Sequence, residues 1–474
     1  MRQRITLIGI SIIAIGITGC GGGSDGSPSV AIPPPVSETP PPPTSGLLTN
    51  EQLRTAVDNS AGLVIEVEAT WFAENTSIIR SLTEDEDFGD LSFLDGDLAN
   101  KRIVMLGESS HGVKQYSQAK VRLIKYLHER LGYNVIAFES GLYECEIEQR
   151  SIERGDARGA MAGCIFGVWD SAEVLELFRY VEATQDTSAP MRITGFDVQY
   201  SGIRARPGRR AAYIASLVEK ASPSYAVEVS NLETLLEDLV ANAGQADSAT
   251  SPSIRELRQA VPTIANNYLV LADYLLANET AITADGTFSR HDVLVAAQVA
   301  RTAPFLAQQT ADRFDLEQSI RHRDEGMALN FIELANAIYP NEKIIGWAHN
   351  AHIRHRGEGF VLDGNMGKHV HDALADEMYT VGFYMYRGQH AFNDRSVQNV
   401  RPPIDNSLEA IFYSRRLAYL WLDLENADLS SDGANWVRSR SVNYAWGYEP
   451  ITMQLNEEYD GLLMIDTAEP PDYL

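Results

Sequence analysis

Residues 101–112 read KRIVMLGESSHG, and this stretch decides the fold. Its apolar run IVML, bounded by basic residues and a glycine, predicts a short buried strand. The next segment, residues 118–131, places apolar residues at helical spacing, and residues 134–139 (NVIAFE) predict a second buried strand. A strand, a helix and a strand in this order are typical of an α/β fold with a parallel sheet.

The same alternation continues along the chain. A helix is predicted at residues 173–184, and further strands are predicted at residues 191–198, 343–353, 379–386, 417–424 and 461–465. Residues 208–335 show no convincing strand, and their apolar residues recur at helical spacing. We therefore predict an α/β domain over residues 47–474, with a central, mostly parallel sheet flanked by helices and a large helical insertion at about residues 208–335.

The N-terminus has the pattern of a lipoprotein signal peptide. Two arginines precede an apolar run over residues 5–17, which is too short to span a bilayer core of about 30 Å as a helix. Residues 17–20 (ITGC) resemble a bacterial lipobox, in which the cysteine becomes the lipid-modified N-terminus. We predict a signal peptide at residues 1–19 and lipidation of Cys20. The alternative is an ordinary signal peptide with an incidental cysteine.

Residues 20–46 are rich in Gly, Ser and Pro and nearly lack large apolar side chains. Such a segment cannot bury enough surface to fold, so it is predicted to be a tether. The chain has 39 Lys+Arg against 65 Asp+Glu, a net charge of −26. This balance argues against a nucleic-acid partner and against docking on lipid through a basic patch. We expect an exported lipoprotein that its lipid anchors to a membrane, facing the periplasm or the cell exterior.

Two further cysteines, Cys145 and Cys164, remain in the folded part. An even pair in an oxidising compartment predicts a disulfide, and two free thiols are the alternative.

Polar side chains follow several predicted strands directly. They are Glu108 and His111, Glu139, Asp197, and His349 and His352. In open α/β sheets, ligands bind outside the carboxyl ends of the strands, so these groups are predicted to share one site. His349 and His352 would point to opposite faces of a continuous strand, and they would converge only if the chain turns at Asn350.

Three chemistries could use such a site. Ser109 or Ser110 could serve a serine hydrolase, although the G-x-S-x-G elbow is absent. Histidines and carboxylates could bind a metal ion, although neither H-E-x-x-H nor a cysteine-rich zinc pattern occurs. The third chemistry is hydrolysis in which His111 removes a proton from water, a role that suits histidine because its ordinary pKa lies near neutral pH.

Several motifs in this order resemble those of the erythromycin esterase family. The matching pieces are GESSHG at 107–112, AK at 119–120, FE at 138–139, GFDVQ at 195–199, RDEGMALN at 323–330, WAHNAH at 347–352, MG at 366–367 and GF at 382–383. Ala351 and Glu325 depart from the residues usual in the family at these positions, and the last eighty residues match only loosely.

The resemblance implies an esterase-type hydrolase, without a metal or other cofactor, that opens a small-molecule ester or lactone, with a macrolide as one candidate. It implies that His111 is the general base, that Glu108 and Glu139 hold the base and the water, and that His349 binds the carbonyl group. Lys120 and His352 would be substrate contacts. Arg323 and Asp324 are predicted to brace a helix against the sheet, with a substrate contact as the alternative.

Two other functions stay open from the sequence. Glu108, His111, Glu139 and His349 could surround one metal ion in a metal-dependent hydrolase or peptidase. The histidines at residues 349–355 and 369–371 could instead belong to a surface lipoprotein that binds haem or another ligand without catalysis.

Overall fold

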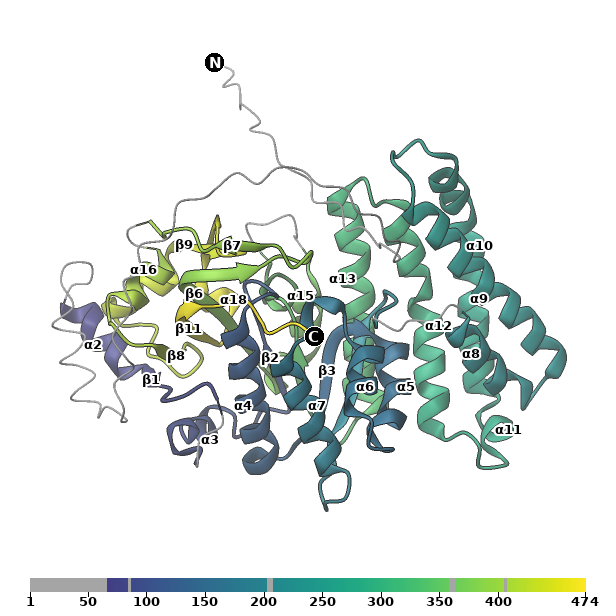
Figure 1. Ribbon diagram of the computed structural model, residues 1–474, viewed down its shortest axis with the longest axis horizontal. Helices are drawn as coiled ribbons and strands as arrows, with labels where there is room; N and C mark the ends of the chain where they lie inside the picture. The colour runs from purple at the N-terminus through teal and green to yellow at the C-terminus, as the bar shows by residue number, and fades with distance from the viewer. Residues whose placement is uncertain (1–65, 84–86, 203–207, 358–363, 405–406) are drawn as a thin grey trace.

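The computed structural model describes residues 66–83, 87–202, 208–357, 364–404 and 407–474. The predicted signal peptide, tether and Cys20 lie outside the described residues. The order of elements along the chain is shown in Figure 1.

The described residues form a nine-stranded sheet with the order β1-β8-β11-β6-β2-β5-β3-β4, in which β7 pairs with β6. Its strands are β1 (Thr76–Ile78), β2 (Ile103–Leu106), β3 (Tyr133–Gly141), β4 (Arg192–Asp197), β5 (Lys343–Trp347), β6 (Met378–Ala391), β7 (Val397–Asn399), β8 (Tyr419–Asp423) and β11 (Gly461–Ala468). The six strands from β11 to β4 are parallel, and only the pairs that involve β8 and β7 are antiparallel. The predicted α/β class with a mostly parallel sheet is therefore confirmed.

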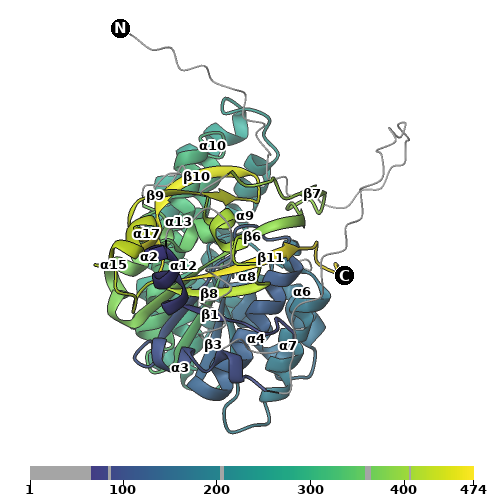
Figure 2. The same ribbon diagram turned by 90° about the vertical axis from the view of Figure 1, so that its left-hand side faces the viewer.

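The two faces of the sheet are covered by different helices. The helices α4 (Lys114–Leu131) and α7 (Ala172–Thr184) lie on one side, and α13 (Leu316–Glu333) and α15 (Met366–Leu374) lie on the other (Figure 2). Because side chains alternate along a strand, Val104 packs into the core on the α4 side, whereas Ile103 and Met105 pack into the other core. The sheet is thus buried on both faces, which explains its nearly continuous apolar strands.

Between β4 and β5 the described chain contains no strand, in agreement with the predicted helical insertion. Its helices are α8 (Arg209–Glu219), α9 (Pro223–Gly244), α10 (Pro252–Ala277), α11 (Glu279–Thr283), α12 (Arg290–Ala311) and α13, followed by a π-helical turn at Leu334–Ile338. They pack beside the sheet (Figure 1) and share one apolar core with α5 (Leu142–Ile152). α6 (Ala157–Cys164) follows α5 and contributes to the core on the α4 side.

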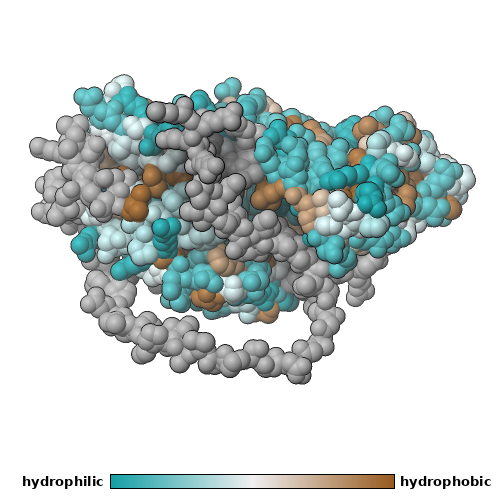
Figure 3. Space-filling model, turned by 90° about the horizontal axis from the view of Figure 1, so that it is seen from above, coloured by the Kyte–Doolittle hydropathy of each residue, from teal (hydrophilic) through white to brown (hydrophobic). Residues whose placement is uncertain are grey.

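Smaller elements complete the fold. They are α2 (Glu66–Glu74), α3 (Leu94–Asp97), α14 (Asn350–Ile353), α16 (Leu408–Tyr413), α17 (Asn435–Arg438), α18 (Leu455–Glu458), four 3-10 turns (Gly89–Leu91, Gly167–Trp169, Ala375–Glu377, Asp432–Ala434) and the hairpin of β9 (Arg440–Ala445) and β10 (Glu449–Gln454). Seen from above, the described surface is mainly hydrophilic with separate hydrophobic patches (Figure 3).

One predicted element is wrong in its extent. Residues 343–353 were expected to form one strand, but β5 ends at Trp347 and residues 350–353 form α14. The Nδ1 atom of His349 accepts a hydrogen bond from the backbone N–H of Ala351 at 3.1 Å, so this side chain caps the new helix. The chain therefore turns at Asn350, which is the condition under which His349 and His352 can converge.

Candidate active site

The polar residues that follow the strands meet at one edge of the sheet. β2, β5, β3 and β4 are successive neighbours, and their carboxyl ends carry Glu108, His349, Glu139 and Asp197. The rings of His111 and His349 have centroids 5.0 Å apart, and those of His349 and His352 lie 6.4 Å apart. The structure thus brings together the strand-end residues that the sequence singled out.

Gly107 explains how two of the family-like motifs can pack together. A Cβ atom built on Gly107 would lie 2.0 Å from the Oδ1 atom of Asn350. That amide donates to the carbonyl of Phe383 at 2.9 Å and accepts from its N–H at 3.2 Å. Asn350 therefore fastens the segment after β5 to β6, and only glycine leaves room for it beside β2.

Glu108 is the centre of the first group, which we call the β2 group: Glu108, His111, Lys120 and Trp169. Glu108 is fully buried, and its Oε1 atom accepts hydrogen bonds from His111 Nδ1 at 2.7 Å and from Trp169 Nε1 at 2.8 Å. Its Oε2 atom accepts from Lys120 Nζ at 2.6 Å. With its Nδ1 proton donated to Glu108, His111 presents a lone pair at Nε2, which forms no hydrogen bond to another described residue.

Lys120 is the buried cation of this group. Its side chain is 0% exposed, and Nζ lies 4.4 Å from the centroid of the Trp347 ring. Burial lowers the pKa of Lys120, while the charge and hydrogen bond of Glu108 oppose that shift. Lys120 is therefore enclosed by Glu108 and the rings of Trp347 and Phe383.

His349 offers a hydrogen-bond donor with no partner. Because its Nδ1 atom accepts from the N–H of Ala351, the neutral ring carries its proton on Nε2. That Nε2 atom is buried and has no hydrogen-bond partner among the described residues. Burial lowers the pKa of His349 well below its usual range and the nearby His111 adds to the shift, while Glu139 and the Ser109 carbonyl oppose it. His349 is therefore neutral and available to donate.

A second group, the β4 group, comprises Glu139, Asp197, Arg323, Asp324 and His352. Arg323, on α13, donates from Nη2 to Asp197 Oδ2 at 2.6 Å and to Glu139 Oε1 at 2.7 Å. The other oxygen of Glu139 accepts from the backbone N–H of His349 at 2.8 Å. Burial alone would raise the pKa of Glu139, but the charges of His352 and Arg323 lower it, so the carboxylate is ionised.

His352 is enclosed by the same group. Its Nδ1 atom lies 2.8 Å from Asp324 Oδ1, and its Nε2 atom lies 3.3 Å from Glu139 Oε1. Burial would lower the pKa of His352, but Asp324 and Glu139 raise it. Asp324 also accepts from the N–H of Met366, at the start of α15. Arg323 and Asp324 thus brace α13 against the sheet and α15, as one of the two sequence interpretations proposed, and the same brace forms one wall of the site.

Two tryptophans of the site were not predicted from the sequence. Trp169 lies in a 3-10 turn and binds Glu108, and its ring meets that of His111 edge-on at 5.0 Å. Trp446 lies in the turn between β9 and β10 and stacks on His349, with ring centroids 4.2 Å apart and an interplanar angle of 22°. Its φ of +57° is the left-handed conformation that costs non-glycine residues about 1–2 kcal/mol. In the sequence, the adjacent pair Trp446 and Gly447 was the one signal of this turn.

The serines of the GESSHG motif are engaged elsewhere. Ser109 Oγ pairs with the hydroxyl of Tyr116 at 2.8 Å, and Ser110 Oγ pairs with Nδ1 of His390 at 3.0 Å. Both serines are buried. Within the described part of the chain, no three His, Cys, Asp or Glu side chains are arranged to hold a metal ion.

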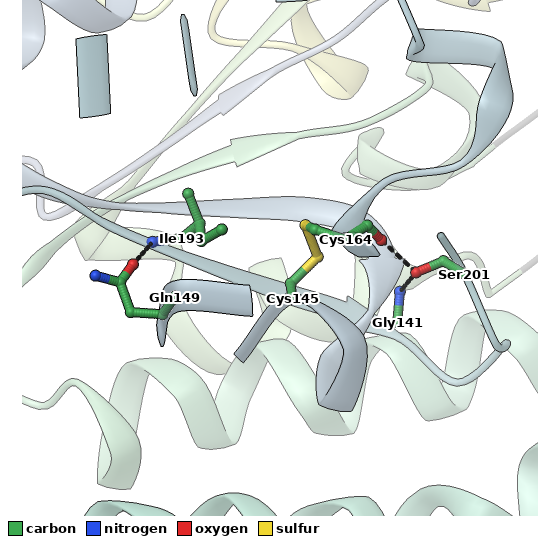
Figure 4. The surroundings of a disulfide bond; sticks show 6 residues. All are labelled: Gly141, Cys145, Gln149, Cys164, Ile193 and Ser201. Carbon is green, nitrogen blue, oxygen red and sulfur yellow. Dashed lines mark hydrogen bonds between the residues drawn. A yellow bond between two sulfur atoms is a disulfide. The ribbon is translucent and has the colours of Figure 1, made fainter. Parts of the chain in front are cut away.

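A disulfide lies close to the end of β3. Cys145 on α5 is bonded to Cys164 at the end of α6 (Figure 4). Next to it, Ser201 accepts from the N–H of Gly141 at 2.9 Å and donates to the carbonyl of Cys164 (Figure 4). These contacts hold the chain that follows Glu139. In the described ranges, no helix is long and apolar enough to cross a membrane.

The carboxyl ends of the strands in this α/β sheet carry paired histidines and carboxylates, groups that can transfer protons in a hydrolysis reaction. The family model described as "Erythromycin esterase" matches residues 128–468. The chain therefore belongs to the erythromycin esterase family, a family of hydrolases.

Individual relatives agree with this. "Putative hydrolase YbfO" of Bacillus subtilis is 29% identical over 402 residues, which cover 80% of this chain and 87% of that protein. Among solved structures, a Bacillus cereus protein is similar with a TM-score of 0.69 at 17% identity, over 90% of this chain and 100% of that one. A mutant of erythromycin esterase EreC in its open conformation gives a TM-score of 0.59 at 17% identity, over 84% of this chain and 98% of that one. The two structures show the shared fold.

Proposed function

We propose that the protein hydrolyses an ester or lactone of a small molecule by general-base activation of water. The observation that carries this proposal is the pairing of His111 Nδ1 with Glu108 at 2.7 Å, which orients the imidazole and leaves Nε2 without a hydrogen-bond partner among the described residues. A general base needs a lone pair within reach of the water proton.

In the proposed reaction, His111 Nε2 removes a proton from water while the water oxygen bonds to the carbonyl carbon. The N–H at Nε2 of His349 donates to the carbonyl oxygen as negative charge develops there. The tetrahedral intermediate then collapses, the bond to the ester oxygen breaks, and the His111 imidazolium returns its proton to the alkoxide. A carboxylic acid and an alcohol, or a hydroxy acid from a lactone, are the products. His111 and His349 are thus the catalytic residues.

The remaining site residues act through these two histidines. Glu108 fixes the tautomer of His111, and Lys120 and Trp169 hold Glu108 in place. Glu139 accepts a hydrogen bond from the backbone N–H of His349, and Arg323 binds the other oxygen of Glu139. The two residues thus fix the position of His349. We therefore propose that Lys120 and His352 are positioning residues, because their polar atoms are engaged within the protein.

Macrolide-type lactones are one candidate substrate class, supported by the family and by the name of EreC. The test is a hydrolysis screen of purified wild type and His111→Ala against macrolactones, simple acyl esters and peptides, each with and without a chelator. We expect turnover of an ester or lactone that resists the chelator and falls about 10²–10⁴-fold in His111→Ala. Wild-type turnover by this variant would overturn the proposal, and loss of activity with the chelator would favour a metal-dependent hydrolase.

We also propose that the protein is exported and held on a membrane through lipid on Cys20. A buried disulfide between Cys145 and Cys164 supports an oxidising compartment. Metabolic labelling with a fatty acid should mark the wild type and leave Cys20→Ala unmarked and released from the membrane fraction. Equal labelling of both proteins would contradict the assignment.

A further inference from the structure

The segment that follows β11, residues 469–474 (EPPDYL), contacts the starts of two helices beside the active site. We call this segment the strap. The family model match ends at residue 468, so the strap lies directly beyond the matched residues. Figure 2 shows the strap, in yellow, leaving β11 and ending near α6. Two of its residues, Pro470 and Pro471, have fixed φ angles, which stiffens the middle of the segment.

The first residue of the strap binds the first turn of α4, which begins at Lys114, just after His111. The carbonyl of Glu469 accepts a hydrogen bond from the backbone N–H of Lys114 at 2.8 Å, and the N–H of Glu469 donates to Gln115 Oε1 at 2.7 Å. The first N–H groups of a helix have no partner within the helix. The side chain of Val113, the residue before α4, makes no capping hydrogen bond. The strap therefore supplies an acceptor that the helix start lacks.

The last residues of the strap bind the start of α7 in the same way. The carbonyl of Asp472 accepts from the backbone N–H of Ala172, the first residue of α7, at 2.9 Å. Tyr473 forms an isolated antiparallel β-bridge with Ser171. Trp169 lies just before this bridge in the chain. The strap thus joins the start of the helix that follows His111 to the start of the helix that follows Trp169.

The side chain of Tyr473 is held by the turn between β6 and β7. The guanidinium carbon of Arg395, in that turn, lies 4.4 Å from the centroid of the Tyr473 ring. Nη2 of Arg395 also donates to the carbonyl of Gly167 at 2.9 Å, in the 3-10 turn that contains Trp169. The hydroxyl oxygen of Tyr473 is buried and has no hydrogen-bond partner among the described residues. The ring of Tyr473, and not its hydroxyl group, therefore anchors the strap.

The two segments that the strap joins meet on a single atom of the active site. Nδ1 of His111 and Nε1 of Trp169 both bind Oε1 of Glu108, at 2.7 Å and 2.8 Å, and the two rings meet edge-on with centroids 5.0 Å apart. Along the chain, His111 and Trp169 are separated by α4, β3, α5 and α6. A displacement of about 1 Å at a catalytic group can cost about 10²-fold in rate. A direct connection between the two segments therefore bears on the reaction.

We propose that the strap is a positioning element of the active site and that Tyr473 is its anchoring residue. By joining the starts of α4 and α7, the strap fixes His111 and Trp169 on Glu108. This inference rests on the proposed function in one respect, because it takes His111 as the base whose position sets kcat. The hydrogen bond between Trp169 and Glu108 can be measured without a substrate, so failure of the strap and failure of the proposed hydrolysis are distinguishable.

The experiment compares the wild type with a chain that ends at Glu469, with Tyr473→Ala and with Tyr473→Phe. The first measurement is the exchange of the Trp169 indole N–H with solvent, followed by ¹⁵N NMR, with the resonance identified by its absence in Trp169→Phe. We expect exchange to be about tenfold faster or more in the shortened chain and in Tyr473→Ala, because the segment that holds Trp169 opens more often. Tyr473→Phe should behave as the wild type, since it keeps the ring against Arg395.

The second measurement is the turnover of an ester or lactone that the wild type hydrolyses. We expect kcat to fall about tenfold or more in the shortened chain and in Tyr473→Ala with little change in KM, and Tyr473→Phe to keep the wild-type rate. Tyr274→Ala is the matched control, because it removes a tyrosine that stacks on Tyr225 with ring centroids 4.7 Å apart in the helical insertion. That variant should lose stability without changing the indole exchange or kcat.

Indole exchange at the wild-type rate in the shortened chain would overturn the proposal, whatever the turnover. A lower Tm in Tyr473→Ala with unchanged exchange and kcat would also overturn it, because a purely structural role predicts that result. Faster exchange with an unchanged kcat would overturn the positioning of the base. If the wild type hydrolyses no ester or lactone, the proposed function fails, and the exchange measurement alone decides whether the strap holds Trp169.

Discussion

The β2 group and the β4 group use histidine and carboxylate side chains in opposite ways. In the β2 group, Glu108 binds one nitrogen of His111 and leaves the other unoccupied. In the β4 group, both nitrogens of His352 lie within 3.3 Å of a carboxylate, Asp324 on one side and Glu139 on the other. Glu139 and Asp197 also bind Arg323, so this group is a connected network of charges.

The comparison indicates that the hydrogen bonds each histidine already makes determine whether it can act as a base. A base needs a nitrogen lone pair with no partner. Nε2 of His111 forms no hydrogen bond to another described residue, whereas Nε2 of His352 lies 3.2 Å from Arg323 Nη1 and 3.3 Å from Glu139 Oε1. A network of mutually paired charges holds its members in place, and it therefore suits a wall of fixed charge around the reacting atoms. The two groups meet at His349, whose backbone is held by Glu139 and whose ring faces His111.

The largest expected effect comes from breaking the β2 group at its centre. Glu108→Gln keeps the size of the side chain but removes its negative charge. That carboxylate orients His111 and balances the positive charge of Lys120. We expect kcat to fall about 10²–10⁴-fold and the free energy of unfolding to fall by about 3–5 kcal/mol, because a buried cation loses its partner. Steady-state kinetics and chemical denaturation measure the two effects.

A double variant separates these two losses. Glu108→Gln with Lys120→Met removes both buried charges, so the stability should largely return while the activity should not. His352→Gln provides the comparison from the β4 group, with a smaller expected loss of kcat. If Glu108→Gln turned over at the wild-type rate, or if His352→Gln lost more activity, the division of roles between the groups would be wrong.

Local signals in the sequence were sufficient for the framework that carries these groups. The apolar runs of β2 and β3 and the spacing of α4 depend on near neighbours, so the strands and the polar residues at their ends were predictable. The end of β5 was not, because the run through Trp347 and Ala348 continues the strand pattern and gives no sign that His349 caps a helix. Periodicity reports which face is apolar, and it does not report caps made by a histidine.

Most of the pairing within the site was beyond the sequence for a different reason. Glu108 binds His111 from only three residues away, but the pairing of His352 with Asp324 and Glu139, and the sharing of Arg323 by Asp197 and Glu139, depend on contacts between residues far apart in the chain. Trp446 is the clearest case, because the β9–β10 hairpin lies in the region that matched the family motifs only loosely. Its role follows from tertiary packing alone.

A substitution of Trp446 tests the role of His349, the residue at which the β2 group and the β4 group meet. Its stacking buries the ring of His349, and its backbone N–H donates to the carbonyl of Ser109 at 2.8 Å. We expect Trp446→Ala to lower kcat about tenfold, in line with the energy of one aromatic pair, and Trp446→Phe to keep most of it. Water reaching His349 should raise its depressed pKa, so an NMR titration of the His349 ring should show its midpoint at higher pH in Trp446→Ala. A loss of Tm with kcat and the pKa of His349 unchanged would reduce Trp446 to a structural role.

The smallest expected effect is a difference in the pH dependence of stability between variants of His349 and His352, which lie three residues apart. The pKa of His352 is raised in the fold, so its contribution to stability is fully present below the unfolded value of about 6.5 and is lost as pH rises through the folded pKa. The pKa of His349 is lowered, so the unfolded chain takes up the proton first and stability is lost as pH falls below about 6.5. Denaturation between about pH 5 and about pH 9 should show His352→Gln most destabilised at the acid end, by about 1.4 kcal/mol per unit of pKa shift. His349→Gln should instead gain on the wild type as pH falls, and parallel curves for the two variants would contradict their assigned charge states.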